Sequence, residues 1–176
     1  MSRSVELLKK RYLENIKEKP DLFVGIELEY PVINLEGKAT NSEVVKDLFR
    51  YLPSVLGFTI EKVDDFGNPI QLLDPVSQDT ILFEVSYTTI EFAFGRAENI
   101  QEVEERFRDY MDLIQKKLGE ANHAIIGSGI HPYWEKNENQ PVAYARYQML
   151  MNYLKLSRTV LGTDLHDYPQ YGAFIC

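Results

Sequence analysis

The sequence predicts an α+β fold, because β-prone segments and amphipathic helical segments share a chain of 176 residues. Residues 24–34 and 80–94 have the composition of strands, and residues 58–74 contain two alternating runs on either side of a strong turn. Residues 98–119 instead repeat apolar side chains at the spacing of one helix face. The length suits one sizeable core, so we expect residues 1–176 to form a single domain.

The first third of the chain is predicted to hold two helices with a strand between them. Apolar residues at helical spacing, and polar residues that suit helix starts, define the two helices. In order, we expect a helix over residues 4–18 capped by Ser4, a strand over residues 24–34, a turn over residues 35–38, and a helix that follows Asn41 or Ser42 and closes at Gly57.

The rest of the chain is predicted to add a hairpin, a long β-region and two more helices. Asp64, Asp65 and Asp74 lie in the hairpin region, where we expect them to cap turns by accepting hydrogen bonds from turn N–H groups. In order, we expect the hairpin over residues 58–74, strand structure over 80–94, a helix over 98–119, a strand within 121–129, a polar loop over 131–141, a helix over 142–161, a loop over 162–170 and a strand from Tyr171.

Composition and charge exclude several classes of function. The formal net charge is -8 at pH 7, which argues against non-specific binding to nucleic acid or to anionic membranes. No apolar run reaches the roughly 18 residues of a membrane span. Residues 1–17 have the pattern of a charged amphipathic helix and not of a signal peptide. The single cysteine, Cys176, permits no internal disulfide, so we expect a protein of the reducing cytoplasm.

The stretch VGIELEY, residues 24–30, carries two acids in an apolar strand pattern. Because alternate residues of a strand face the same way, Glu27 and Glu29 should project together, away from Leu28 and Tyr30. Two adjacent carboxylates on an inward face repel each other and are costly to desolvate, unless a divalent cation or a wet cleft accepts them. The pattern alone favours the other reading, an edge strand whose acids face solvent.

A second acidic segment lies within TILFEVSYTTIEFAF, residues 80–94, whose only charges are Glu84 and Glu91. They are seven residues apart, so a regular strand would place them on opposite faces. Both can face one site only if a bend, bulge or short loop lies between Ser86 and Thr89. Acids in apolar surroundings are seldom there for packing, because an unpaired buried carboxylate is costly, although solvent exposure remains the alternative.

Four sequence blocks, taken together, resemble the glutamate–cysteine ligase family in its bacterial carboxylate–amine ligase branch. The blocks are VGIELEY, the hairpin with DDFGNPI, the segment FEVSYTTIEFAFGRAENIQEVEERF, and IIGSGIHPYW followed by ARYQML. No single block is specific, since short acidic strands are common. Their order and spacing, however, resemble that family over essentially the whole chain.

The resemblance implies a glutamine-synthetase-like fold, in which a curved, mainly antiparallel sheet forms a funnel, here incomplete, backed by helices. It implies an ATP-dependent ligase that makes γ-glutamylcysteine, as in glutathione biosynthesis. Glutamate would attack the γ-phosphate of ATP, and the amine of cysteine or another acceptor would displace phosphate from the resulting acyl phosphate. Mg²⁺ or Mn²⁺ would neutralise the phosphates. Glu27, Glu29, Glu84 and Glu91 fall on the family's metal-binding strand positions.

The same resemblance suggests further site residues. Arg146 matches the family's site-lining arginine, which is predicted to act in catalysis and to bind ATP, with a helix-surface arginine as the alternative. Arg96 is a second candidate for binding the nucleotide. Tyr87 and Thr88 lie in the predicted bend and are candidates for binding substrate. His131 is a candidate for binding substrate or for ordering its loop, not for binding metal.

The chain is shorter than the family pattern, so we expect it to be the N-terminal portion of a longer catalytic domain and inactive alone. An exposed sheet edge would favour self-association into a homo-oligomer. Expected partners are glutamate, an amine and ATP, and not nucleic acid or membranes. The alternatives are a non-catalytic binding or structural module derived from the same fold and another phosphoryl-transfer enzyme, such as a guanidine kinase. His123 and His166 are expected to be structural or surface residues.

Overall fold

A computed structural model describes residues 2–133, 136–137 and 140–161, with side chains described up to residue 153. The expected loop over 162–170, the strand from Tyr171, and His166 lie outside the described residues. The helices are α1 (Arg3–Glu14), α2 (Ser42–Leu56), α3 (Ile100–Gly119) and α4 (Ala145–Leu161). The strands are β1 (Glu27–Asn34), β2 (Thr59–Val63), β3 (Pro69–Leu73), β4 (Thr80–Phe83), β5 (Thr89–Ala93) and β6 (His123–Ile125).

These strands form one antiparallel sheet in the order β2-β3-β4-β5-β1-β6. Two hairpins, β2–β3 and β4–β5, lie side by side, and β1 then pairs with β5 although the two are distant in sequence. The sheet is curved and does not close, because β2 and β6 each have one strand neighbour. The predicted α+β class with a mainly antiparallel, open sheet is therefore confirmed.

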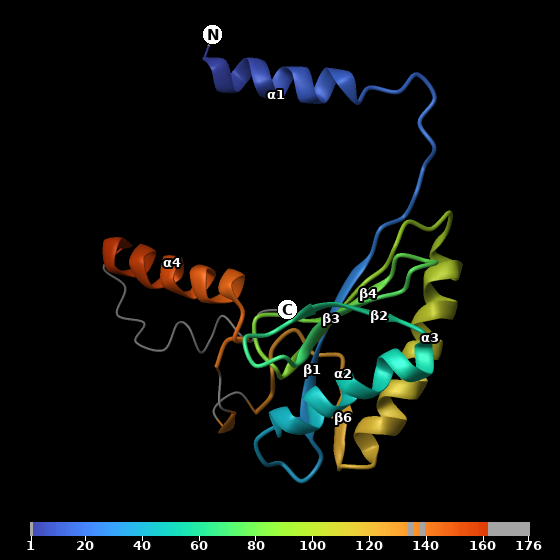
Figure 1. The fold of residues 1–176 in the computed structure, drawn as a ribbon, viewed down its shortest axis with the longest axis vertical. Helices are drawn as coiled ribbons and strands as arrows, with labels where there is room; N and C mark the ends of the chain where they lie inside the picture. Colours follow the sequence, from blue (N-terminus) through green and yellow to red (C-terminus); the bar gives the residue numbers. More distant parts are fainter. Residues whose placement is uncertain (1, 134–135, 138–139, 162–176) are drawn as a thin grey trace.

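Helices α2 and α3 cover one face of this sheet, and α4 lies on its other side (Figure 1). Phe49 of α2 stacks on Phe83 of β4, with 3.9 Å between the ring centroids. Leu28 and Tyr30 pack against the same core, as the alternation in β1 predicts. The fully buried side chains that the central strands contribute are Val32, Ile81, Phe83, Ile90 and Phe92.

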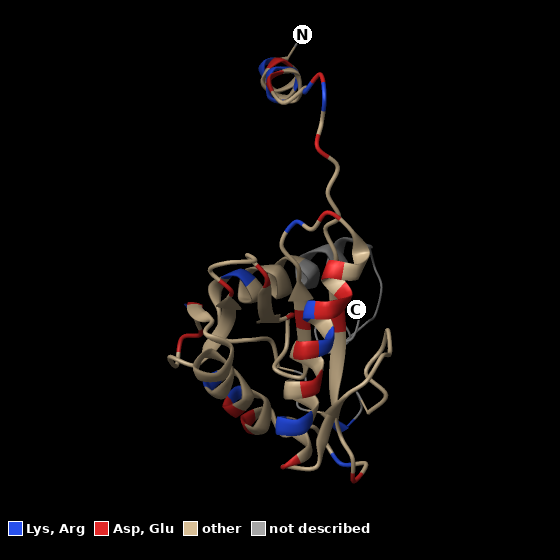
Figure 2. Ribbon diagram, turned by 90° about the vertical axis from the view of Figure 1, so that its right-hand side faces the viewer, with Lys and Arg blue, Asp and Glu red and all other residues tan. Residues whose placement is uncertain are grey.

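Helix α3 is amphipathic, as its sequence predicts. Its buried residues are Val103, Tyr110, Ile114 and Leu118. Along its outer side, acidic and basic residues are interleaved (Figure 2), so the charges form a solvated face. Asn99 caps its start by accepting a hydrogen bond of 3.0 Å from the N–H of Glu102.

A buried ion pair ties α3 to the sheet just before β4. Asp79 is 1% exposed, and its Oδ2 lies 2.8 Å from Nε of Arg106 and accepts a hydrogen bond of 2.9 Å from the Tyr110 hydroxyl. The Arg106 N–H is not aimed at that oxygen, so the contact is an ion pair without a hydrogen bond. The other oxygen of Asp79 accepts from the N–H of Gly95 at 2.7 Å. A Cβ at Gly95 would lie 2.0 Å from the carbonyl oxygen of Ser77, so only glycine fits there.

Helix boundaries follow the predicted caps at α2 and differ at α1. The N-cap of α2 is Asn41, and Gly57 ends the helix in the left-handed conformation with φ of 74°. Helix α1 is capped by Ser2 instead of Ser4, because Ser2 is the extended residue whose side chain accepts from the N–H of Val5. It stands apart from the sheet and has no buried residue (Figure 1). Within the described residues, no helix has the length and apolar composition that crossing a bilayer would need.

Candidate functional site

Three of the four candidate glutamates share the face of the sheet that α2 and α3 leave uncovered. The pairing of β1 with β5 places Glu29 directly opposite Glu91 and Glu27 opposite Ala93. Directly opposed residues in an antiparallel pair project to the same side, with Cβ atoms about 5 Å apart. The two acidic segments therefore meet, as the single-site interpretation required.

The fourth glutamate reaches this face through the turn over residues 84–88. Glu84 follows β4 directly, and its N–H donates to the carbonyl of Thr89 at 3.1 Å, which closes the hairpin. Val85 adopts a φ of 53°, a strained value for a β-branched residue. The carboxyl groups of Glu84 and Glu91 are hydrogen-bonded to each other. The bend that the sequence required between these two acids is confirmed.

Electrostatics at this cluster favour protonation. Burial, with the hydrogen bond to Glu84 as the next cause, raises the pKa of Glu91 from 4.5 to about 7. Burial also raises the pKa of Glu84, and the pKa of Glu29 rises because of burial and the charge of Glu91. A hydrogen bond between two carboxyl groups needs one proton, so below about pH 7 the pair holds a proton where a cation would otherwise compensate the charge.

Arg146 brings a positive charge to the glutamate pair from the first turn of α4. Its charge lowers the pKa of both Glu84 and Glu91, but less than burial raises them. The next residue, Tyr147, is buried and donates a hydrogen bond of 2.7 Å to the carbonyl of Phe83. This contact fixes the start of α4 beside the end of β4, where Glu84 emerges.

A set of hydrogen bonds around Tyr87 joins three separate chain segments, and we call it the tyrosine clasp. The Tyr87 hydroxyl donates to Oδ2 of Asp64 at 2.7 Å and accepts from the N–H of Ala143 at 3.1 Å. The N–H of Asp65 donates to the carbonyl of Ala143 at 2.8 Å, and the N–H of Val142 donates to the carbonyl of Val85 at 2.7 Å. The clasp therefore fixes the segment that leads into α4 and Arg146.

The structure places the substrate candidates in three different surroundings. Tyr87 lies in the clasp, and Thr88 is 4% exposed beside it, with its carbonyl accepting from the N–H of Val32 at 2.8 Å. His131 is fully buried, its Nε2 donates to the carbonyl of Val32 at 2.8 Å, and its Nδ1 accepts from the N–H of Tyr133. Burial lowers the pKa of His131, so the ring is neutral and orders its loop. A role for these residues in substrate binding stays a prediction.

Arg96 and His123 lie away from the cluster. The guanidinium of Arg96 sits over the ring of Phe23, 5.1 Å from its centroid, in the segment that precedes β1. No contact described for Arg96 joins it to the glutamates, so its nucleotide-binding role also stays a prediction. His123 is buried, and its Nε2 accepts from the N–H of Asn41, which fits the expected structural role.

The donor set of this face has the chemistry that hard divalent cations require. Carboxylate oxygens are the preferred ligands of Mg²⁺ and Mn²⁺. Arg146 does not neutralise the group, because the pKa values of Glu29, Glu84 and Glu91 all stay raised. As the side chains stand, no three Asp, Glu, His or Cys groups within the described residues converge on one point. The ligand chemistry therefore suits a divalent cation, but the present side-chain positions do not bring three such groups together, and at least one side chain would have to rotate to do so.

Sequence reasoning missed the clasp. Asp64 was expected to cap a turn, and it does accept from the N–H groups of Phe66 and Asn68. Its second oxygen binds Tyr87, which is 23 positions away. No local pattern signals such a contact, because it depends on how two hairpins lie side by side. Tyr147 gave a weak signal, as an aromatic residue at helical spacing beside Arg146.

Comparison with known families supports the resemblance seen in the sequence. The family described as glutamate–cysteine ligase family 2 matches residues 23–172. The matched region contains all four glutamates, the clasp and Arg146, and α1 precedes it. No curated protein matches the chain.

Proposed function

Because this chain belongs to glutamate–cysteine ligase family 2, we propose that it carries the metal-binding face of an ATP-dependent carboxylate–amine ligase. The proposed reaction joins the side-chain carboxylate of glutamate to an amine, such as that of cysteine, through an acyl phosphate formed from ATP. One observation carries the proposal: four carboxylates from two separate β-segments gather on the open face of the sheet, and three of them have raised pKa values.

Glu27, Glu29, Glu84 and Glu91 are the residues that would hold Mg²⁺ or Mn²⁺ in this proposal. A bound divalent cation would supply charge neutralisation for the phosphates of ATP. The glutamates must first release the proton shared by Glu84 and Glu91. Because the pKa of Glu91 is about 7, this release is half complete near neutral pH without a metal. Metal affinity should therefore increase as pH rises through this value.

Arg146 is proposed to hold a substrate carboxylate or phosphate. A guanidinium presents paired N–H donors that match either group. Arg146 is exposed at the start of α4, and its charge lowers the pKa of Glu84 and Glu91, so it lies near the carboxylate face and is accessible from solvent. The clasp and the bond from Tyr147 to Phe83 hold the helix start there.

The test compares Glu91→Gln and Glu84→Gln with a matched control, Glu61→Gln. Glu61 also lies in the sheet, on β2, but the contact described for its carboxylate is a hydrogen bond accepted from the side-chain amide of Gln71. Free Mn²⁺ measured by electron paramagnetic resonance at pH 8 should show binding weakened by about tenfold or more in the two test variants and unchanged in the control. Equal Mn²⁺ binding by all four proteins would contradict the metal assignment.

Ligation is tested separately, by phosphate release from ATP that requires both glutamate and an amine. In a protein with this activity, Glu27→Gln or Glu84→Gln should abolish release while the far-ultraviolet circular dichroism stays that of the wild type. Unchanged turnover would refute the proposed role of these carboxylates. Mn²⁺ binding without ligation by any amine tested would favour the non-catalytic module over the ligase.

A further inference from the structure

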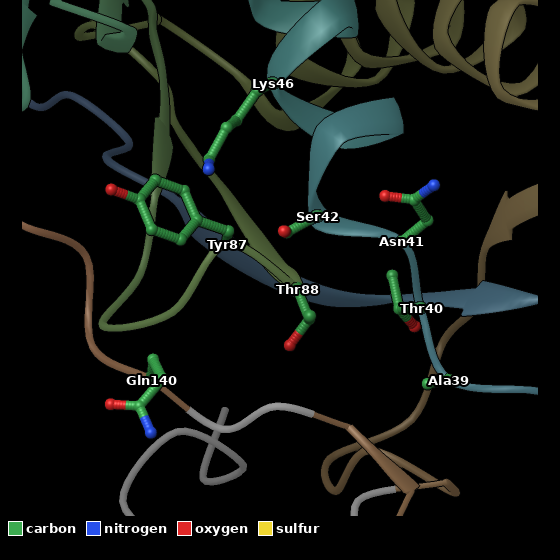
Figure 3. A pocket seen from close by; sticks show the side chains of 8 residues that line it. All are labelled: Ala39, Thr40, Asn41, Ser42, Lys46, Tyr87, Thr88 and Gln140. Carbon is green, nitrogen blue, oxygen red and sulfur yellow. The ribbon is translucent and has the colours of Figure 1, made fainter. Parts of the chain in front are cut away.

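Helix α1 takes no part in the sites described above. It precedes the residues that the family matches, and it stands apart from the sheet, joined to β1 by residues 15–26 (Figure 1). The cavity of about 410 Å³ beside the start of α2, in contrast, is lined by Tyr87 and Thr88 and belongs with the candidates for substrate binding (Figure 3). A role for α1 therefore depends on its own surface.

The surface of α1 carries an apolar stripe. The residues that line one hollow along the helix are Val5, Leu8, Lys9, Tyr12 and Leu13. Residues three, four and seven apart lie on the same side of an α-helix, so these side chains form one continuous stripe. None of the residues of α1, each of which the structure describes, is buried. The stripe is therefore open to a partner.

A helix of this length needs a partner to be stable. Helix α1 has 12 residues, and isolated helices shorter than about 12–15 residues are only marginally stable in water. In folded proteins, most of the stability of a helix comes from burial of its apolar face. Because α1 buries none of its residues against the described part of the chain, contact of its stripe with another molecule would supply this stability.

The charges beside the stripe suit a second copy of the same helix. Glu6 lies one turn before Lys9, on the same flank of the stripe. When two copies of α1 lie antiparallel about a two-fold axis between residues 8 and 9, the two lysines lie next to the axis and the two glutamates lie outside them. Each Lys9 is then within reach of Glu6 of the second copy, so opposite charges meet along this flank.

Side-chain size and the charge of the rest of the chain also favour the antiparallel arrangement. About the same axis, the small Val5 lies opposite the large Tyr12 of the second copy, so the two stripes interdigitate. Residues 1–19 hold six of the 19 basic residues and only three of the 27 acidic ones, so the acidic excess lies in the rest of the chain. Two such acidic bodies repel each other, and antiparallel helices place them at opposite ends of the pair.

We propose that α1 binds α1 of a second copy of this chain as an antiparallel, two-fold symmetric helix pair. The apolar stripes pack together, the aliphatic stem of Lys9 covers their edge, and its ammonium pairs with Glu6 of the second copy. The contact is short, so it belongs with weak interfaces, and we expect a dissociation constant in the micromolar range. The proposal goes beyond the ligase reaction and does not depend on it, because α1 lies outside the residues that the family matches.

The test is sedimentation velocity of the full chain over a concentration series, with two adjacent leucines as the matched pair. Leu8 lies in the stripe and Leu7 on the opposite side of the helix, and their exposed fractions are similar, 56% and 59%. Leu8→Gln should weaken the dimer by about tenfold or more, because two-fold symmetry makes the change act twice. Leu7→Gln should dimerise as the wild type does. Glutamine and leucine have similar helix propensities, so the difference between the variants reports the stripe.

Charge substitutions test the identity of the partner. Lys9→Glu and Glu6→Lys, each alone, should weaken the dimer several-fold, because four like charges then meet beside the axis. A mixture of these two variants should dimerise at least as well as the wild type, since acids and bases then alternate along the flank. Lys10→Glu is the matched control. It changes the net charge as Lys9→Glu does, but Lys10 lies on the outer side of the helix, with its ammonium 3.6 Å from the carboxylate of Glu14.

Several results would overturn the proposal. A wild-type chain that stays monomeric up to about 1 mM would do so, as would failure of the two charge variants to associate when mixed. Equal dimerisation by Leu8→Gln and the wild type would move the contact to another surface, such as the exposed sheet edge. Binding of a monomeric chain to anionic lipid vesicles would assign the stripe to a membrane instead. Mn²⁺ binding should be the same in Leu8→Gln and the wild type, so the outcome is separate from that of the metal assignment.

Discussion

Two carboxylate sites within the described residues compensate their charge in opposite ways, one around Asp79 and one formed by Glu84 and Glu91. Asp79 is almost fully buried, yet Arg106, the Tyr110 hydroxyl and the N–H of Gly95 surround it with positive charge and donors. Glu84 and Glu91 are less buried, but they face each other and share a hydrogen bond. The first site is complete within the chain, and the second obtains its compensation from a proton.

The difference indicates which acids stabilise the fold and which are available for chemistry. A buried carboxylate with its own cation and donors links α3 to the sheet and has no capacity left for a ligand. Carboxylates that must share a proton destabilise the folded state at the pH where they would ionise, and a divalent cation would relieve them. Burial alone does not separate the two cases, but the partners do.

The largest expected effect is on stability, at the Asp79 site. Asp79→Asn should destabilise the protein by about 2–3 kcal/mol, because the buried Arg106 loses its counter-charge, and the figure allows for the 26% exposure of the Arg106 side chain. Urea unfolding measures the change. Asp47→Asn is the control, since Asp47 pairs with Arg50 on the surface and is 68% exposed, so little should change. Equal stability of the two variants would remove the contrast between the sites.

The next effect is the pH dependence of stability that arises from the Glu84–Glu91 pair. The pKa of Glu91 is raised from 4.5 to about 7 in the folded state, so the folded state binds this proton more tightly than the unfolded state does. In the absence of metal, the free energy of unfolding should therefore be highest near pH 4.5 from this group and decline by about 1–2 kcal/mol as pH rises to 7, after allowance for partial exposure.

Glu91→Gln should lose that decline and be at least as stable as the wild type at pH 8, whereas Glu61→Gln should keep it. The measurement is chemical denaturation at pH 4.5, 6, 7 and 8 in the presence of a chelator. A wild-type free energy of unfolding that rises between pH 5 and 7, with the rise lost in Glu91→Gln, would have the wrong sign for a proton-sharing pair. It would place Glu91 with Asp79, among the acids that the fold neutralises.

A smaller effect is expected from the clasp. Tyr87→Phe removes a hydroxyl that joins Asp64 to Ala143 and should cost about 1 kcal/mol in urea unfolding. Because the clasp holds the segment before Arg146, the variant should also raise the pKa of Glu91, as the guanidinium becomes less well placed. Tyr12→Phe, at an exposed tyrosine of α1, should change neither quantity.

The sequence was informative where the pattern is local. The alternation in VGIELEY correctly separated Glu27 and Glu29 from Leu28 and Tyr30, and the spacing of Glu84 and Glu91 correctly required a turn between them. Pairing of β1 with β5, which joins the two acidic segments, followed from no local signal and entered through the family resemblance. Tyr30 of β1 and Phe92 of β5 both contact Phe107 of α3, so the pairing is accompanied by packing against a helix distant in sequence from β1.

Local sequence patterns did not reveal the roles of residues whose partners are distant in the chain. Asp79 was not singled out, because an acid before a strand resembles a turn residue until Arg106 and Tyr110 are placed beside it. His131 attracted attention as a histidine after a glycine-rich segment, and it proved to be a buried hydrogen-bonding residue under the loop. In both cases the chemistry is set by burial and partners, which composition does not encode.

The smallest expected effect separates two arginines that the sequence suggested for the same task. Arg146 lowers the pKa of Glu84 and Glu91, whereas Arg96, which follows β5, lies over Phe23 in the segment before β1. Carbon-13 NMR titration of the glutamate carboxyls should show the apparent pKa of the Glu84–Glu91 pair moving upward in Arg146→Gln and staying in place in Arg96→Gln. Because Arg146 is exposed, solvent screens its charge and the shift should be modest. A shift in the Arg96 variant alone would mean that Arg96, and not Arg146 of α4, is the arginine that acts on the Glu84–Glu91 pair. The contrast with Asp79 would then have to include Arg96 as a neutralising group.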